Sequence, residues 1–125
     1  STLVQVKHIK KGSRIGYNGT YTASKNMTIG IIPAGYYEGV DRRLSNNGVV
    51  LIDGKPCAIL GRISMNMTTI NLSHVPKAKV GEPVVIYSND SSQVNSFEKT
   101  AKIAGTIPYE LLVHLAESVR RVRLG

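Results

Sequence analysis

The sequence is poor in the residues that build disulfides and metal sites. Cys57 is its one cysteine, so no internal disulfide can form and a zinc site made of clustered cysteines is excluded. A reducing, cytoplasmic compartment is therefore expected. His8, His74 and His114 are scattered without the spacing of metal ligands. We expect each to be an ordinary surface or core histidine, and we expect no metal site.

Acidic residues are also scarce. Eight Asp and Glu stand against 16 Lys and Arg, which gives a net charge of +8. The acids are spread along the chain, so nothing indicates a paired-carboxylate site. The positive excess favours an anionic partner, such as nucleic acid, an acidic protein face or a phosphorylated small molecule. The basic residues gather at 7–14, 42–43 and 120–123, and solvated surface explains each cluster equally well.

Long apolar runs are missing too. The longest, such as 49–52, are far too short to span a membrane, and no signal-like segment is visible at the N-terminus. The chain has no Gly-rich phosphate loop followed by Lys-Ser or Lys-Thr, and no nucleophile motif surrounds Ser64. With 125 residues, 42% of them hydrophobic, it predicts one soluble domain over 1–125.

Short apolar segments between turn residues predict a chain built mainly from strands. Asp53-Gly54 is the clearest hairpin turn, because both residues tolerate the positive φ of a type I′ turn. Helical spacing predicts a short helix from Phe97 to Ala104, capped by Asn95 or Ser96, and a second one from Pro108. Segment 34–44 fits neither period and predicts an ordered surface loop. The expected strands lie at 4–8, 21–23, 27–32, 49–52, 55–60, 68–72, 84–87 and 119–124.

The regular spacing of these strands indicates the fold class. Strands that recur every ~8–12 residues, with turns between them, are typical of a barrel or sandwich. No repeat or linker divides the chain. We predict a mainly β fold: a small closed β-barrel of about seven to eight strands with two short helices near the C-terminus.

Tyrosines and arginines in loops are the main candidates for chemistry. Tyr17 sits in a glycine-flanked turn at 15–21, where an exposed turn aromatic is the simplest interpretation. A phenol with a pKa of about 10 is a poor base at neutral pH, but a neighbouring cation stabilises its anion. It can then exchange a proton with an acidic carbon. The residues alone offer half of a site: a phenolic acid/base and anion-binding arginines, without an electrophile.

Five ordered motifs resemble the C-terminal domain of alanine racemases. They cover nearly the whole chain, in the order and close to the spacing of that family. They are Ile15 to Tyr21, Ile32 to Leu44, Asp53-Gly54, Gly61 to Met67, and Ile107 to Glu110. The resemblance implies a β-barrel domain of a pyridoxal-phosphate enzyme that interconverts L-alanine and D-alanine for the bacterial cell wall. In that family a separate N-terminal (β/α)₈ barrel, absent here, holds the cofactor through a lysine. We therefore expect the isolated domain to bind no cofactor and to be inactive.

The resemblance also implies roles for individual residues. Tyr17 corresponds to the catalytic tyrosine, one of two bases on opposite faces of the substrate α-carbon; the cofactor lysine is the other. Met65 corresponds to a residue whose backbone helps to bind the substrate carboxylate, and Tyr109 to one that hydrogen-bonds the cofactor phosphate. Tyr36 forms a narrow gate with Tyr109. The remaining positions of the access corridor are Arg42, Arg62 and Ile107.

The same resemblance implies a partner chain. Two subunits pair head to tail, so this domain would face the N-terminal barrel and the cofactor of the partner subunit. The sequence departs from the family at Asn66, where Asp is usual, and at Ser64, where Cys is common. The first change removes a charge beside the substrate-binding backbone. Neither Lys10 nor Lys11 can stand in for the missing cofactor lysine.

Two other hypotheses remain open at this point. A stand-alone basic β-barrel could bind single-stranded nucleic acid, which the charge and the strand spacing allow. That hypothesis predicts aromatic residues interleaved with basic ones on strands, whereas most tyrosines here lie in Gly- and Pro-containing loops. A dimerisation module is compatible with the racemase interpretation. We expect neither nucleic acid nor a membrane to be a partner.

Overall fold

The computed structural model describes the chain except for residues 16–18, 20, 89–91, 107, 109–110 and 112–125. The described part is mainly β, as predicted, and among its residues no helix has the length and apolarity needed to cross a bilayer. Its elements are β1 (Gln5–Ile9), β2 (Arg14–Ile15), β3 (Tyr21–Thr22), β4 (Met27–Ile32), η2 (Tyr36–Glu38), η3 (Arg42–Leu44), β5 (Val49–Ile52), β6 (Lys55–Leu60), β7 (Thr68–Asn71) and α1 (Phe97–Ala104), where η marks a 3₁₀ helix.

Five strands form one antiparallel sheet in the order β1-β4-β7-β6-β5, and β2 pairs only with β3. In the part of the chain that the structure describes, continuous strands do not close this sheet into the predicted barrel. Isolated bridges instead join segment 83–85 to both edges of the sheet. Thr2, near the β1 edge, bridges Pro83, and Leu51 of the β5 edge bridges Val85. The strand predicted at 84–87 is therefore reduced to a single bridge at Val85, because the chain bends at Ile86 and Tyr87.

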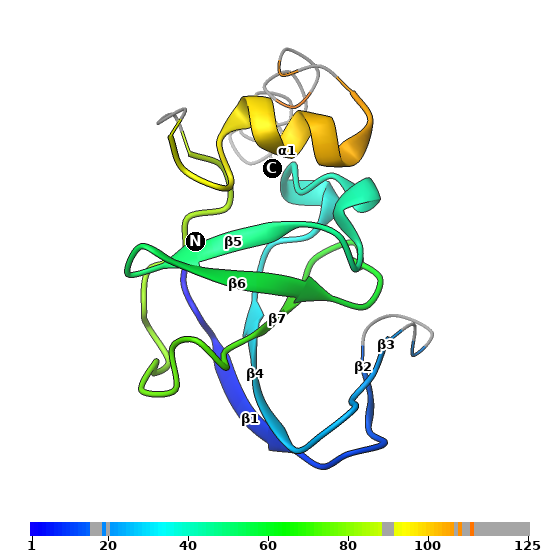
Figure 1. Cartoon of the computed structure of the whole chain (residues 1–125), viewed down its shortest axis with the longest axis vertical. Coiled ribbons are helices and arrows are strands. Elements are labelled where there is room, and N and C mark those ends of the chain that lie inside the picture. Colours follow the sequence, from blue (N-terminus) through cyan, green and yellow to red (C-terminus); the bar gives the residue numbers. More distant parts are fainter. Residues whose placement is uncertain (16–18, 20, 89–91, 107, 109–110, 112–125) are drawn as a thin grey trace.

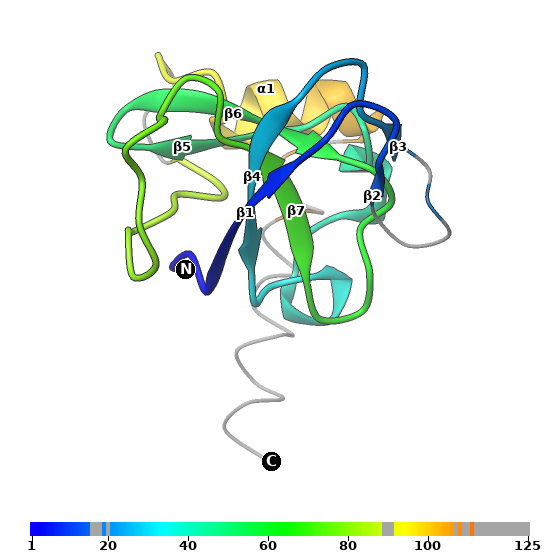
Figure 2. The same cartoon turned by 90° about the horizontal axis from the view of Figure 1, so that it is seen from below.

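Two apolar clusters form the core. The larger one lies between the main sheet and the loops that cover it, and the smaller one lies under the β2–β3 hairpin. Figure 2 shows that hairpin at one side of the sheet. β1 contributes less than its alternation predicted, because Val6 and Ile9 are only partly buried and the rest of the strand is exposed. The smaller cluster consists of Ile15, Ala23, Met27, Ile29 and Leu60, with Ile9 and Tyr21 packed against it.

Two local predictions are confirmed by backbone geometry. Asp53 has a φ of 51° and Gly54 a φ of 73°, so the β5–β6 hairpin turns where the dipeptide indicated. The Ser96 side chain caps α1 by accepting a hydrogen bond from the Lys99 backbone, and Gly105 ends the helix at a φ of 75°. Helix α1 contacts η3 and lies above the β5–β6 hairpin in Figure 1.

Segment 34–44 differs from the surface loop that the sequence predicted. It contains both 3₁₀ helices, and Ala34, Val40 and Leu44 are buried in the larger core cluster. Asp41 caps η3, since its side chain accepts a hydrogen bond from the Arg43 backbone. The helix predicted from Pro108 lies mostly outside the described residues, and the strand predicted at 119–124 lies wholly outside them.

Candidate active site

Segment 35–44 docks on the turn formed by residues 64–67. The Tyr36 N–H donates to the Ser64 carbonyl at 3.1 Å, and the Tyr37 N–H donates to the Met65 carbonyl at 2.9 Å. The buried Thr68 hydroxyl donates to the Ala34 carbonyl at 2.6 Å, just before the segment begins. These bonds hold two of the predicted site residues, Tyr36 and Met65, in adjacent chain segments.

Gly35 makes this close docking possible. A Cβ atom at this position would lie 2.1 Å from the Ser64 carbonyl oxygen and 2.7 Å from the Asn66 nitrogen. Both are backbone atoms, so no side-chain rotation could relieve the clash. Glycine is required here for the approach of two backbones rather than for an unusual φ.

The 64–67 turn is closed by Ser64. Its N–H donates to the Met67 carbonyl at 3.1 Å, while its hydroxyl contacts both the Met67 carbonyl and the Met67 N–H at 3.1 Å. The two central residues, Met65 and Asn66, are exposed. In the described part of the chain their N–H groups have no hydrogen-bond acceptor. The turn therefore offers two backbone donors suited to an anion.

Arg42 lies over the ring of Tyr36. Its guanidinium carbon is 4.7 Å from the ring centroid, within the range of a cation–π interaction. No carboxylate pairs with Arg42 among the described residues, because the nearest acid in sequence, Asp41, pairs with Arg43 instead. Two predicted corridor residues are thus in direct contact, and no described carboxylate neutralises the charge of Arg42.

The backbone on either side of Arg62 is tied to the end of η3. The Ser45 hydroxyl donates to the Arg42 carbonyl at 2.7 Å and accepts from the Ile63 N–H at 2.9 Å. The Gly61 N–H donates to the Asn46 side chain at 2.6 Å. Arg62, itself exposed, is therefore held close in space to the segment that carries Arg42.

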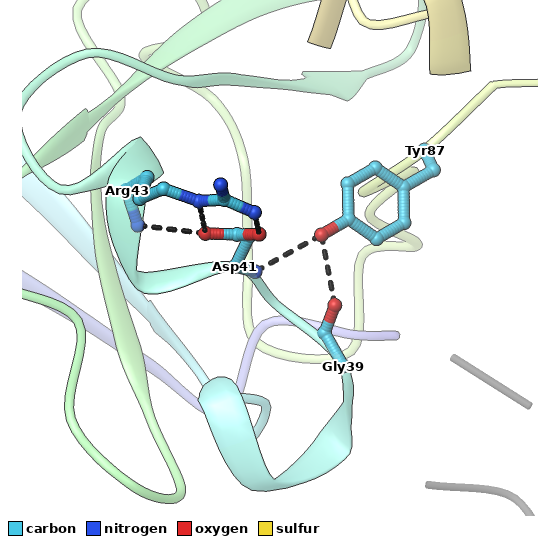
Figure 3. Close-up of polar contacts among 4 residues, drawn as sticks. All are labelled: Gly39, Asp41, Arg43 and Tyr87. Atoms are coloured by element: carbon cyan, nitrogen blue, oxygen red, sulfur yellow. Dashed lines mark hydrogen bonds and ion pairs between the residues drawn. The ribbon is translucent and has the colours of Figure 1, made fainter. Parts of the chain in front are cut away.

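A second network, drawn in Figure 3, holds segment 35–44 from the other side. The Tyr87 hydroxyl donates to the Gly39 carbonyl at 2.8 Å and accepts from the Asp41 N–H at 3.0 Å. The Asp41 carboxylate accepts two bonds from the Arg43 guanidinium, at 2.9 and 2.7 Å. Burial raises the pKa of Tyr87 to about 12, although the bond from Asp41 opposes the shift.

The β2–β3 hairpin carries the loop that contains Tyr17. Its strands pair at two positions, Arg14 with Thr22 and Ile15 with Tyr21. The Arg14 guanidinium contacts the Gly19 carbonyl at 3.4 Å across the loop. The hairpin rests on the smaller core cluster, which includes Leu60 at the end of β6. It therefore packs next to the strand that leads into the 61–67 loop.

The structure thus brings together four of the predicted site residues: Tyr36, Arg42, Met65 and, through its neighbours, Arg62. Tyr17, Ile107 and Tyr109 lie outside the described residues. Within the described ranges, no group of three or more His, Cys, Asp or Glu could hold a metal ion.

Sequence reasoning missed the residues that support the site. Asp41 carried a usable signal, because an Asp directly before Arg-Arg-Leu is a good helix cap. Asn46, which has a φ of 59°, also carried a signal, because it lies in an Asn-Asn-Gly run, a composition that favours turns. Tyr87 had no such signal, since its partners are more than forty residues away, at a separation of 46 and 48 positions.

Together these features define a β-rich domain that presents tyrosine, arginine and backbone donors on neighbouring loops. The family model described as "Alanine racemase, C-terminal domain" matches residues 1–123. The chain therefore belongs to the alanine racemase C-terminal domain family, and the family resemblance predicted from the motifs is confirmed. Nothing in this match supports the nucleic-acid hypothesis.

Relatives and solved structures agree with this assignment. The chain is 39% identical over 122 residues to an alanine racemase of Leptospira interrogans, covering 98% of this chain and 31% of the relative. It is 37% identical over 119 residues to a catabolic alanine racemase of Schizosaccharomyces pombe, covering 95% of this chain and 31% of the relative. The crystal structure of alanine racemase from Bartonella henselae with covalently bound pyridoxal phosphate has a TM-score of 0.84 and 28% identity, over 92% of this chain and 31% of that one. The chain spans about a third of the length of these proteins.

Proposed function

We propose that this chain is the C-terminal domain of a pyridoxal-phosphate-dependent alanine racemase, which interconverts L-alanine and D-alanine. The observation that carries the proposal is the family match over residues 1–123, which includes all five sequence motifs. The domain supplies a tyrosine base to the cofactor site of the partner subunit in a head-to-tail homodimer. The product D-alanine serves bacterial cell-wall synthesis in the cytoplasm. The bridges at Thr2–Pro83 and Leu51–Val85 support the proposal that its sheet approaches a β-barrel.

The described residues fit an amino acid held beside a phosphorylated cofactor. The N–H groups of Met65 and Asn66 have no acceptor in the described part of the chain, so the turn can bind a carboxylate. Arg42 adds a positive charge nearby that no described carboxylate neutralises. Tyr109 would hold the cofactor phosphate. When bound, pyridoxal phosphate supplies the electron sink that makes the α-hydrogen of the amino acid acidic.

Each residue of this chain then has a defined task. Tyr17 removes or returns the proton on one face of the α-carbon, while the lysine of the N-terminal barrel serves the other face. The Met65 backbone orients the substrate carboxylate. Tyr36 and Tyr109 narrow the opening to the site. The wider corridor is formed by Arg42, Arg62 and Ile107, whose arginines attract the carboxylate of the incoming amino acid.

Substitution of Tyr17 in the two-domain gene product tests the proposal. A general base contributes about 10²–10⁴-fold to the rate, so Tyr17→Phe should lower racemisation by about that factor. Cofactor absorbance and the circular dichroism spectrum should stay unchanged. Tyr21→Phe is a matched control on the same hairpin and should keep wild-type turnover. Turnover of Tyr17→Phe within about twofold of wild type would assign the base to another residue.

The 125-residue chain alone provides a second test. Without the N-terminal barrel it lacks the cofactor lysine, so it should form no D-alanine from L-alanine and added pyridoxal phosphate. The readout is chiral chromatography of the reaction mixture, with free pyridoxal phosphate as the blank. D-Alanine formed faster than in the blank would contradict the expected inactivity of the isolated domain.

A further inference from the structure

We propose that Tyr87 and Asp41 act as positioning residues that set the aperture of the substrate opening and so favour alanine over larger amino acids. The inference rests on the proposed function, because it concerns the opening to the same site. Both residues act through segment 35–44, which carries Tyr36 and Arg42, and we assign neither of them a contact with the substrate.

Tyr87 fixes the link between the two 3₁₀ helices. Its ring packs against the larger core cluster, so the position of its hydroxyl is set by the core. That hydroxyl donates to the Gly39 carbonyl, one residue after η2, and accepts from the Asp41 N–H, one residue before η3. One side chain thus bonds both ends of the connection, as Figure 3 shows. Gly39 has a φ of 95°, so the connection depends on a conformation that side chains disfavour.

Asp41 pairs with Arg43 and so leaves Arg42 available to the substrate. Its side chain is buried, at 6% exposure, and accepts both nitrogen donors of the Arg43 fork. It also accepts the Arg43 backbone N–H at 2.9 Å. The carboxylate thus accepts three hydrogen bonds from Arg43, while Arg42 lies over the Tyr36 ring. A change at Asp41 would leave two neighbouring arginines to compete for the same space.

The side of segment 35–44 that faces the 64–67 turn is held by hydrogen bonds that do not involve Tyr87. Tyr36 and Tyr37 donate to the 64–67 turn, and the Val40 N–H donates to the Gly35 carbonyl at 3.0 Å. Loss of the Tyr87 hydroxyl leaves these bonds and the burial of Val40 and Leu44 intact, so the segment stays docked while the link from Gly39 to Asp41 gains freedom to shift. The expected result is a wider opening around Tyr36 rather than an unfolded loop.

Tyr87→Phe in the two-domain enzyme tests the proposal, because it keeps the ring and removes the hydroxyl. The measurement is kcat/KM for L-alanine and for L-2-aminobutyrate, which is one methylene larger. Discrimination of one methylene is worth about 10–200-fold in a fitted site. We expect the alanine value to fall by about fivefold and the ratio of alanine to 2-aminobutyrate by about threefold or more. Asp41→Asn should shift the ratio in the same direction and serves if Tyr87→Phe does not fold.

The ratio separates positioning from simple loss of stability. A smaller folded fraction lowers both kcat/KM values by one factor and leaves their ratio unchanged, and this outcome would overturn the inference. Ser73→Ala is the matched control, since it deletes a hydroxyl bonded to Asn71 just past the end of β7 and should leave the ratio unchanged.

A double-mutant cycle with Arg42→Ala tests the route of action. If Tyr87 acts through the placement of Arg42 and Tyr36, then Tyr87→Phe should change the ratio less in the Arg42→Ala background than in wild type. If the effects of the two substitutions on the ratio are fully additive, Tyr87 does not act through Arg42. A wild-type two-domain protein without racemase activity would overturn the proposed function as well, whereas an active enzyme with an unchanged ratio in both variants overturns this inference alone.

Discussion

The two parts of the candidate site are built in different ways. The segments around Tyr36 and Met65 are joined by backbone hydrogen bonds, by Thr68 and by the Tyr87 network. The β2–β3 hairpin, which carries the Tyr17 loop, pairs at only two positions and contacts its own loop through Arg14. The part proposed to bind substrate thus combines polar contacts with the buried side chains of Val40 and Leu44, whereas the part proposed to carry the base rests mainly on the apolar cluster beneath it.

This difference suggests a division of labour within the domain. Hydrogen bonds have strict distance requirements, so they suit the part that we propose to place a carboxylate and an opening. Apolar packing is less directional and needs only a filled interface under the hairpin. Changes in the first part should therefore affect activity more than stability, and changes in the second part should do the reverse. Four predictions follow this contrast, in order of decreasing effect.

Gly35→Ala should have the largest effect on activity. Its Cβ would lie 2.1 Å from the Ser64 carbonyl oxygen, so segment 35–44 and the 64–67 turn must separate. A displacement of about 1 Å can cost about 10²-fold in rate, and overpacking costs about 1–3 kcal/mol of stability. Gly54→Ala is the control: it is strained by about 1 kcal/mol at its positive φ but lies in a hairpin turn away from the site. Equal activities of the two variants would show that the site does not require glycine at position 35.

Ile15→Ala should chiefly reduce stability. Ile15 is buried in the smaller cluster under the β2–β3 hairpin. Removing such a side chain costs about 2–5 kcal/mol, measured by urea unfolding followed by circular dichroism. Racemase activity of the folded enzyme should fall less than in Gly35→Ala. Val80→Ala, at a residue 64% exposed, should change the unfolding free energy by less than about 0.5 kcal/mol. A loss below about 1 kcal/mol for Ile15→Ala would mean that polar contacts hold the hairpin after all.

Thr68→Val removes one hydrogen bond from the segments around Tyr36 and Met65, with little change in side-chain shape. The buried Ala34 carbonyl loses the hydroxyl that now lies at 2.6 Å. An unsatisfied buried acceptor costs about 1–3 kcal/mol, and we expect a modest rise in KM for alanine because Ala34 precedes the docked segment. Thr22→Val, at an exposed position of β3, is the control for the same chemical change. If Thr68→Val lowers the free energy of unfolding as little as the control does, water must replace the Thr68 hydroxyl as the partner of the Ala34 carbonyl.

Alkaline titration should produce the smallest effect. Burial raises the pKa of Cys57 from 9.0 to about 11 and that of Tyr87 from 10.0 to about 12. The unfolded chain therefore loses these protons first as the pH rises, and the free energy of unfolding should fall between about pH 9 and pH 12. Below pH 9 neither group contributes a pH dependence. Cys57→Ala should flatten the lower half of this decline and Tyr87→Phe the upper half; parallel curves for all three proteins would contradict the assignment.

Sequence patterns predicted the regular elements well where the cause was local. The Asp53-Gly54 turn and the cap of α1 depend on neighbouring residues, and both occur as expected. The prediction for 84–87 was wrong in extent, because only Val85 forms a bridge there and the chain bends at Ile86 and Tyr87. Segment 34–44 was also misjudged, since Val40 and Leu44 are buried by contacts distant in sequence.

The candidate site shows the same limit. Family motifs indicated Tyr36, Arg42, Arg62 and Met65, and the structure places the segments of all four next to one another. They did not indicate Tyr87, because its partners lie in a distant segment and no spacing rule connects them. Tyr17, Ile107 and Tyr109 remain predictions from sequence alone.

The single bridges at segment 83–85 have one further consequence. They lie on a seam of the sheet that contains no continuous strand, and the chain that crosses it reaches Tyr87 two residues after the Leu51–Val85 bridge. A local opening of this seam would also withdraw the hydroxyl from Gly39 and Asp41. If Tyr87 sets the opening around Tyr36 as proposed, local opening of the sheet at this seam also changes that opening, and amide hydrogen exchange should show Val85 and Asp41 opening with one shared free energy.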